Sequence, residues 1–297
     1  MHTRRNLIAV MLLLSLAACN LPVPTATLPP LPLPTDTQVV VPPATETSLP
    51  PTATTEPTLE PTAEPTAIPG TPVEFSGIFF RIPQGVGSTI SGTVEPAVTD
   101  SSLPLFELTP GDIRIQLTDY ILQNTLHKPI VLVTPIQAAK ALDPIFVQRY
   151  GELESTLAAK PAEAESLPFM PIFNAAQVFH TTPVYLDFQN GTGLRYLTQF
   201  DQAYMPISNY SLIYTFQGIT ADGKYHVALI LPVSHASLPA DETVVSDYQA
   251  FIDNFPTYLQ EVKTTLNAAG PDEFTPSLAA LDALAQSLLV QPVGLPE

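Results

Sequence analysis

The stretch that decides the fold runs from residue 183 to residue 233 and reads PVYLDFQNGTGLRYLTQFDQAYMPISNYSLIYTFQGITADGKYHVALILPV. It holds four segments in which apolar residues recur at alternate positions, which is the period of strands that bury one face. Turn-forming residues at 190–192 and at Asp222-Gly223 separate the segments in pairs. The stretch therefore predicts a four-stranded antiparallel meander of two hairpins with one buried face.

The register of each hairpin is predicted by the pairing that sets apolar side chains opposite one another. In the first hairpin, a three-residue loop of Asn190, Gly191 and Thr192 gives the pairs Phe188 with Leu194, Leu186 with Tyr196, and Asp187 with Arg195 as an ion pair. In the second hairpin, a type I′ turn at Asp222-Gly223 gives the pairs Phe216 with Leu229, Tyr214 with Leu231, and Leu212 with Val233.

Segments before the meander add strands and one helix. Strands are predicted at 75–82, 89–98, 113–117 and 130–133. The helix is predicted to begin with Asp143 as N-cap and Pro144 as its first residue, and 160–166 is expected to form a loop. The apolar stripe of this helix consists of Ile145, Phe146, Tyr150, Leu153 and Leu157.

Two C-terminal helices are predicted to cover the meander. The first has a kink or restart at Pro256 and carries the stripe Tyr248, Phe251, Ile252, Phe255, Leu259, Val262 and Leu266. The second begins with Thr275 as cap and Pro276, and carries Leu278, Leu281, Leu284 and Leu288. The expected fold class is α+β, with an antiparallel sheet of about six to eight strands and helices packed mainly on one face.

The order of these elements is similar to that of a known family. With the sheet first and a last helix that runs from Phe274-Thr275-Pro276 to Ser287-Leu288, the chain resembles the α/β/α sandwich of PsbP and Mog1-like proteins. Those proteins are mostly accessory or binding factors, so the resemblance implies binding rather than catalysis. Residues 196–234 also resemble uncharacterised domains of bacterial envelope lipoproteins, which implies no particular activity.

Residues 1–18 have the pattern of a signal peptide. A basic start is followed by an apolar run at 7–18, which is shorter than the roughly 20 residues of a membrane-spanning helix. The run ends in Leu16-Ala17-Ala18-Cys19, which resembles the lipobox of bacterial lipoproteins. The resemblance implies cleavage before Cys19, lipid attachment to its thiol, and a location on the extracytoplasmic face of a bacterial membrane or envelope. The alternative is an ordinary secretory signal.

Residues 19–72 are expected to form a disordered tether that follows the lipidated Cys19. Residues 20–72 hold 15 prolines, 13 threonines and five acidic residues, with no basic or aromatic residue. Repeated prolines favour polyproline II, and little apolar surface is present to bury. The tether is either a spacer or a docking tract for a proline-binding partner. A single α+β domain is expected over 73–297.

Composition excludes several classes of function. The chain has 11 basic and 28 acidic residues, a net charge of −17, so nucleic-acid binding is excluded. A single cysteine rules out an intramolecular disulfide framework and cysteine-based zinc sites.

Two short patterns indicate chemistry only weakly. Residues 218–224 match the start of a phosphate-binding loop, G-x-x-x-x-G-K, but Tyr225 stands where the magnesium ligand Ser or Thr belongs. The expected hairpin turn also lacks the helix N-terminus that holds a phosphate. Ser234 lies next to His235, but adjacent residues on an extended chain point apart.

Other candidate residues are expected to be structural. His127, His180, His226 and His235 lack the short spacings of a zinc site. The acid pairs Glu152/Glu154, Glu163/Glu165, Asp241/Glu242 and Asp272/Glu273 are expected on the surface, with a weak calcium site at Asp241/Glu242 as the alternative. Core packing is expected for Tyr185, Tyr196, Tyr204, Tyr210, Tyr214 and Tyr225, with a groove for a glycan or peptide as the alternative. No cofactor, metal or catalytic residue is assigned.

The sequence thus favours a lipid-anchored extracytoplasmic module that is attached to the membrane through Cys19 and binds an envelope protein, peptide or polymer without catalysis. The first alternative is an envelope hydrolase whose catalytic residues come from separated loops. The second alternative is a structural surface lipoprotein.

Overall fold

The computed structural model describes residues 69–295. The expected signal peptide at 1–18, Cys19, and the expected tether as far as residue 68 lie outside the described residues. The strands are β1 Thr71–Phe75, β2 Ile78–Ile82, β3 Ile90–Glu95, β4 Asp112–Leu117, β5 Ile130–Pro135, β6 Ala176–Phe188, β7 Gly191–Asp201, β8 Ile213–Thr220, β9 Tyr225–Pro232, β10 Ser234–His235, β11 Phe274–Thr275 and β12 Leu289–Val290. The helices are α1 Ile136–Lys140, α2 Pro144–Ala159, α3 Tyr248–Ala268 and α4 Leu278–Gln286, and three-residue 3₁₀ turns lie at Leu105–Glu107, Glu242–Val244 and Pro271–Glu273.

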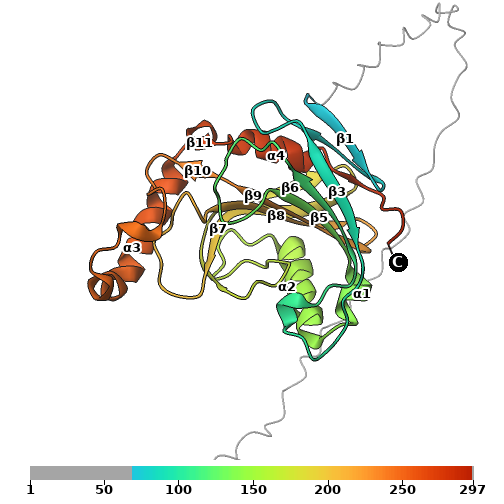
Figure 1. Cartoon of the computed structure of the whole chain (residues 1–297), viewed down its shortest axis with the longest axis horizontal. Coiled ribbons are helices and arrows are strands. Elements are labelled where there is room, and N and C mark those ends of the chain that lie inside the picture. The colour runs from blue at the N-terminus through green and yellow to red at the C-terminus, as the bar shows by residue number, and fades with distance from the viewer. Residues whose placement is uncertain (1–68, 296–297) are drawn as a thin grey trace, which may run out of the picture. The chain divides into compact units, whose positions relative to one another are not determined.

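The central element is a seven-stranded antiparallel sheet with the order β3-β4-β5-β9-β8-β7-β6 (Figure 1). Strands β6 to β9 are successive neighbours in it, so the predicted meander and the predicted α+β class are confirmed. The predicted number of strands is confirmed as well.

Both faces of this sheet are covered, whereas the sequence predicted one buried face for the meander. Every residue of β8 and β9 is buried. On one face, α1, α2 and the loop at 167–175 cover a cluster that includes Leu194, Tyr196 and Ile230. On the other face, α4 and the small sheet β1-β2-β12 cover a second cluster around Tyr214 and Phe216. The strands at the centre of the sheet are therefore buried on both faces, and side chains of both alternating sets lie in a core.

The β8–β9 hairpin has the predicted register but a different turn. Phe216 pairs with Leu229 and Tyr214 with Leu231. Gly223 has φ of +71° and its N–H donates to the carbonyl of Thr220 at 2.8 Å, whereas Asp222 is not among the residues with positive φ. The turn is therefore type I followed by a left-handed glycine, not type I′.

The β6–β7 hairpin contradicts the predicted register. Phe188 pairs with Gly191 and Leu186 with Gly193, so the loop is shorter than predicted. The two glycines leave room for aromatic rings. A Cβ at Gly191 would lie 2.2 Å from the Phe188 ring, and a Cβ at Gly193 would lie 2.3 Å from the Phe216 ring. Local turn chemistry could not show this role of the glycines.

The ion pair predicted between Asp187 and Arg195 is also wrong. Arg195 lies opposite Val184 across a bulge in β6, and its Nε lies 3.0 Å from Oδ1 of Asp282 on α4. The hydroxyl of Tyr214 donates to the same carboxylate oxygen at 3.0 Å. This polar contact therefore joins α4 to the sheet through side chains that are nearly buried.

Three element boundaries differ from the prediction. The segment 75–82 is a strand end, a turn at Ser76-Gly77 with positive φ, and β2. Helix α4 begins at Leu278 after Ser277, because Thr275 is extended and pairs with Ser234. Helix α3 is continuous through Pro256. The predicted start of α2 is confirmed, because the carboxylate of Asp143 accepts the N–H of Ile145 at 2.9 Å.

Strand β12 joins distant parts of the chain. Val290 pairs with Ile78 of β2. The N–H of Val290 donates to the side-chain oxygen of Asn190 at 3.0 Å, and the side-chain amide of Asn190 donates to the carbonyl of Val290 at 2.7 Å. Val290 therefore bridges the N-terminal hairpin and the β6–β7 loop.

Candidate functional site

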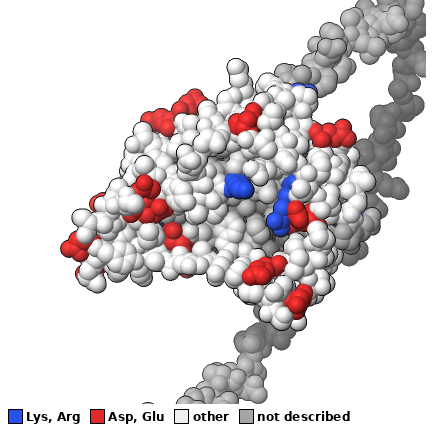
Figure 2. All heavy atoms as spheres, viewed as in Figure 1, with Lys and Arg blue, Asp and Glu red and all other residues white. Residues whose placement is uncertain are grey.

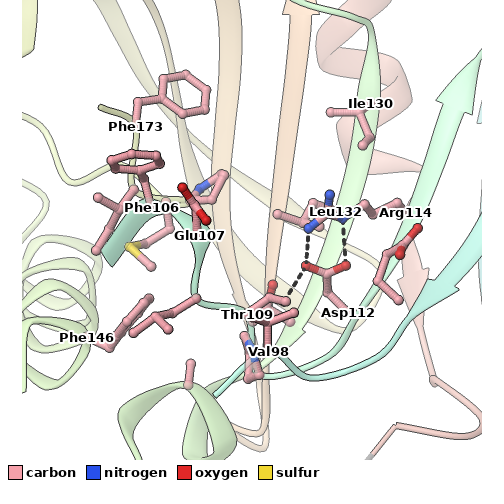
Figure 3. Close-up of a pocket in the computed structure, with 18 of the residues that line it drawn as sticks. Val98, Phe106, Glu107, Thr109, Asp112, Arg114, Ile130, Leu132, Phe146 and Phe173 are labelled. Carbon is pink, nitrogen blue, oxygen red and sulfur yellow. Dashed lines mark hydrogen bonds and ion pairs between the residues drawn. The ribbon is translucent and has the colours of Figure 1, made fainter. Parts of the chain in front are cut away.

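A cavity of about 710 Å³ opens on the α2 face of the sheet (Figure 3). Its floor comes from β4, β5 and β9, one wall comes from α2, and loops at 96–110 and 170–173 close the other sides. This volume lies in the range of roughly 300–1,000 Å³ that small-molecule sites occupy.

One side of the cavity is apolar and aromatic, and the other side carries an ion pair. Figure 3 shows Phe106, Phe146 and Phe173 on the side opposite Asp112 and Arg114. Phe173 belongs to an aromatic cluster with Phe169 and Phe200, in which ring centroids lie 4.4 to 5.1 Å apart. Further apolar residues in the lining are Val98, Leu103, Leu108, Ile130, Leu132, Ala139, Met170, Ile172 and Ile230.

The ion pair is internally satisfied. Asp112 and Arg114 are two residues apart on β4, so both side chains point to the same face. Nε and Nη2 of Arg114 donate to the two carboxylate oxygens of Asp112 at 2.8 and 3.0 Å, and the hydroxyl of Thr109 donates to Asp112 at 3.1 Å. Hydrogen bonding to Asp112 raises the pKa of Arg114, and the negative charge of Glu95 raises it further. The pair therefore forms a neutral unit in the cavity wall.

Two hydroxyl groups in the cavity have no partner. Tyr150 of α2 is 1% exposed and Thr134 of β5 is 6% exposed, and both line the cavity. Neither side chain makes a hydrogen bond with any of the residues 69–295. Burial raises the pKa of Tyr150 well above its ordinary value, and the charge of Asp112 raises it further, so the phenol stays protonated. Both hydroxyls can therefore donate to a bound molecule.

Two histidines border the same region and are uncharged at neutral pH. His127 lines the cavity and stacks on Phe173 with ring centroids 5.2 Å apart, and burial lowers its pKa to about 4. His226 lies against Tyr150 with centroids 5.4 Å apart, and burial lowers its pKa to about 3. Within the described part of the chain, Nε2 of His127 and Nδ1 of His226 have no hydrogen-bond partner.

Gln217 of β8 fixes one loop of the cavity to the sheet. Its side-chain oxygen accepts the N–H of Met170 at 2.9 Å, and its amide donates to the carbonyl of Met170 at 3.1 Å. The same oxygen lies 3.0 Å from Nε2 of His226. Met170 lines the cavity, so this part of the lining is held in place before any ligand binds.

Several of the residues that the sequence marked as candidates for chemistry do not line this cavity. Residues 218–224 form the end of β8 and the hairpin turn that leads into β9, and no helix begins there. His235 lies on β10 and not on β9 with His226, and Nε2 of His180 contacts the carbonyl of Glu165 at 3.1 Å. The hydroxyl of Ser234 faces the carbonyl of Thr275 at 3.4 Å.

A serine contact near His235 was not found from the sequence. Nδ1 of His235 lies 2.7 Å from the hydroxyl of Ser237, and the N–H of Ser237 also points to Nδ1 at 3.2 Å. This is a local turn of the chain. The spacing His-x-Ser at 235–237 was the only signal for it.

The alternative calcium site at Asp241/Glu242 is not formed, because the two carboxylates point apart. Asp241 accepts the N–H of Thr243 at 2.9 Å, while Glu242 accepts the hydroxyls of Ser208 and Ser211. Within residues 69–295, no group of three or more His, Cys, Asp or Glu side chains is arranged to hold a metal ion.

The alternative aromatic groove is also wrong, because its tyrosines are spread over the molecule. Tyr196 and Tyr214 are buried on opposite faces of the sheet. Tyr204 and Tyr210 are exposed, and the hydroxyl of Tyr185 donates to the carbonyl of Pro161 at 3.0 Å. Among the tyrosines of the chain, it is Tyr150 that lines the cavity.

The chain is an α+β sheet domain with a mostly apolar cavity on one face of the sheet. No family model, curated protein or solved structure matches the chain. None of the helices in the described range 69–295 has the length and apolar character to cross a membrane.

Proposed function

We propose that the protein is a lipid-anchored extracytoplasmic binding module whose ligand occupies the cavity beside α2. The observation that carries this proposal is the pair of unpartnered hydroxyls, Tyr150 and Thr134, in a large apolar cavity. Polar groups that line a cavity and have no protein partner bond to water or to a ligand.

The polar groups of the cavity support binding rather than catalysis. The carboxylate of Asp112 is engaged by Arg114 and Thr109, which leaves it poorly placed to act as a general base. Both nearby histidines are neutral, and in the described structure neither contacts a serine or threonine hydroxyl that could serve as nucleophile.

The surface charge supports an uncharged or cationic partner. Residues 73–297 carry 9 basic and 23 acidic side chains. On the face shown in Figure 2, acidic side chains are scattered over the surface and outnumber the basic ones, most of which lie near the middle. Such a surface repels nucleic acids and other polyanions.

The lipobox and the Pro/Thr-rich segment support the proposed anchor. Extended polyproline II of 53 residues reaches about 160 Å at roughly 3.1 Å per residue. The tether would hold the domain near a membrane and let its cavity sample the surrounding envelope.

The anchor is tested by growing cells with an alkyne analogue of palmitate. The wild-type protein should be labelled, and Cys19→Ala should remain unlabelled and either keep its signal peptide or be shed. An unlabelled wild-type protein would contradict the anchor.

The cavity is tested with the uncharged fluorescent probe N-phenyl-1-naphthylamine and a chain that spans residues 20–297, which keeps the whole described fold. The probe should gain fluorescence on binding. Ile130→Trp should abolish the gain because Ile130 lines the cavity, and the matched control Ile121→Trp should not, because Ile121 is 51% exposed outside it. Equal binding by both variants would place the probe elsewhere.

A hydrolase is the second candidate, because Ser237 contacts His235. Its test is labelling by a fluorophosphonate probe, with Ser237→Ala as the control. We expect no labelling, because Nδ1 of His235 already accepts the backbone N–H of Ser237.

A further inference from the structure

We propose that the cavity selects an uncharged amphiphile, with its apolar chain or ring along the phenylalanine side and a hydroxyl or carbonyl head at Tyr150 and Thr134. This inference rests on the proposed function and names the ligand class of the same cavity.

The apolar part of the ligand follows from the walls. Phe106, Phe146, Phe173 and the aliphatic residues around them make this side mostly apolar. Its polar side chains are Glu107, which lies beside Phe106, and His127, which stacks on Phe173. Burying apolar surface there yields roughly 25 cal/mol per Å². A ligand that fills a cavity of about 710 Å³ therefore gains most of its affinity from a carbon-rich body.

The head group follows from what lies at the polar end. Thr134 extends the β4–β5 register so that it lies beside Asp112 on the same face of the sheet. Thr134 pairs with His226 of β9, and the ring centroid of His226 lies 5.4 Å from that of Tyr150, so Tyr150 lies near the same end of the cavity. Two neutral hydroxyls, each able to donate and accept, match a hydroxyl or carbonyl group.

An anionic head is disfavoured. The cations in the lining are Arg114 and Lys128, but Asp112 occupies two nitrogens of Arg114 and Glu95 adds a second negative charge. Glu107 also lines the cavity. A carboxylate would thus lose water and meet net negative charge.

A cationic head is disfavoured for a different reason. The carboxylate of Asp112 is 3% exposed and already accepts three hydrogen bonds. His127 is neutral at pH 7 and stacks on Phe173, on the phenylalanine side of the cavity. At this end of the cavity a buried ammonium would find the hydroxyls of Tyr150 and Thr134 and a carboxylate already paired with Arg114, which do not compensate for its lost hydration. Glu107 lies on the other side of the cavity, beside Phe106.

The test uses three decyl compounds that differ only in their heads: 1-decanol, decanoate and decylammonium. Each is titrated below its critical micelle concentration at pH 7 against N-phenyl-1-naphthylamine bound to the chain of residues 20–297. Decanol should displace the probe at a concentration at least about tenfold lower than either charged compound, since a buried unpaired charge is penalised more than a hydrogen-bonded hydroxyl.

Two variants link this selectivity to the head-group site. Tyr150→Phe and Thr134→Val should each weaken decanol binding by about 2- to 12-fold and leave the charged compounds unchanged, as expected for one neutral hydrogen bond. Tyr150→Phe should leave the unliganded melting temperature unchanged or higher, because no protein bond is lost. The matched control is Tyr196→Phe, which removes a buried hydroxyl that donates to the carbonyl of Pro168 at 2.8 Å. It should lower the melting temperature and leave the order of the decyl compounds unchanged.

The outcomes separate the two levels of the proposal. If the probe binds but decanoate or decylammonium displaces it as well as decanol does, the ligand class is overturned and the binding module stands. If Tyr150→Phe and Thr134→Val both leave decanol affinity unchanged, the head-group site is overturned. If neither the probe nor any decyl compound binds, the proposed function falls together with this inference.

Discussion

Replacing Gly223 by alanine should destabilise the domain, whereas the same replacement at Gly151 should stabilise it. A Cβ added at either position would meet no atom within 4 Å, so side-chain clashes contribute nothing at either site. The two positions differ in backbone conformation, because Gly223 has φ of +71° in a turn and Gly151 lies inside α2.

The magnitudes follow from that difference. An L-residue in the left-handed region costs about 1–2 kcal/mol, so Gly223→Ala should lose about 1 kcal/mol and the β-branched Gly223→Val about 2 kcal/mol. Alanine inside a helix is better than glycine by about 0.5–1 kcal/mol, so Gly151→Ala should gain that amount. A domain of this size changes its melting temperature by about 2–4 °C per kcal/mol.

The assay is urea unfolding of the three variants and the wild type. Unfolding is followed by circular dichroism, because the chain has no tryptophan whose fluorescence could be used, and thermal melting curves are recorded as well. The m-values should stay equal, so that midpoint shifts report stability alone. If Gly223→Ala is as stable as the wild type, or if Gly151→Ala loses as much as Gly223→Ala, backbone conformation does not explain the two glycines.

Three further predictions address the domain boundary, the turn and the buried histidine. Limited proteolysis should leave a resistant core that starts near Val73, since both apolar clusters lie beyond it; a first stable fragment well past Ser88 would contradict this boundary. ATP with Mg²⁺ should not raise the melting temperature, because residues 218–224 are a hairpin turn; a rise that Lys224→Ala abolishes would restore the phosphate-loop interpretation. His226 has its pKa lowered from 6.5 to about 3 by burial, so the unfolded chain takes up a proton first and stability should fall as the pH drops from 6.5 towards 3. This histidine contributes a slope that approaches about 1.4 kcal/mol per pH unit, and His226→Gln should remove it in denaturation series at several pH values.

The sequence predicted the elements whose signals are local. Asp143 and Pro144 mark the start of α2, and Gly223 fixes the register of the β8–β9 hairpin through its own turn. The predicted β6–β7 register was wrong because Gly191 and Gly193 are required by aromatic rings that pack against them, which is a tertiary contact. A pattern read along one strand carries no information about such contacts.

The cavity could be predicted only in part. The apolar stripe correctly placed Tyr150 on the buried face of α2, but it could not show that the hydroxyl lacks a partner. Asp112 and Thr134 become neighbours only when β4 pairs with β5. Loop 96–110, which completes the cavity, has no periodic signal, and its shape depends on the sheet against which it packs.

The bridge at Val290 means that the domain can be completed only when the C-terminal part of the chain is present. Without residue 290, β2 has an unpaired edge and the side chain of Asn190 lacks both of its backbone bonds to Val290. Strand β12 lies far along the chain from β2, so this edge stays open in any product that lacks the C-terminal residues. Unpaired strand edges can pair with strands of other chains, so a product that ends before residue 290 exposes an aggregation-prone edge that is paired in the complete domain.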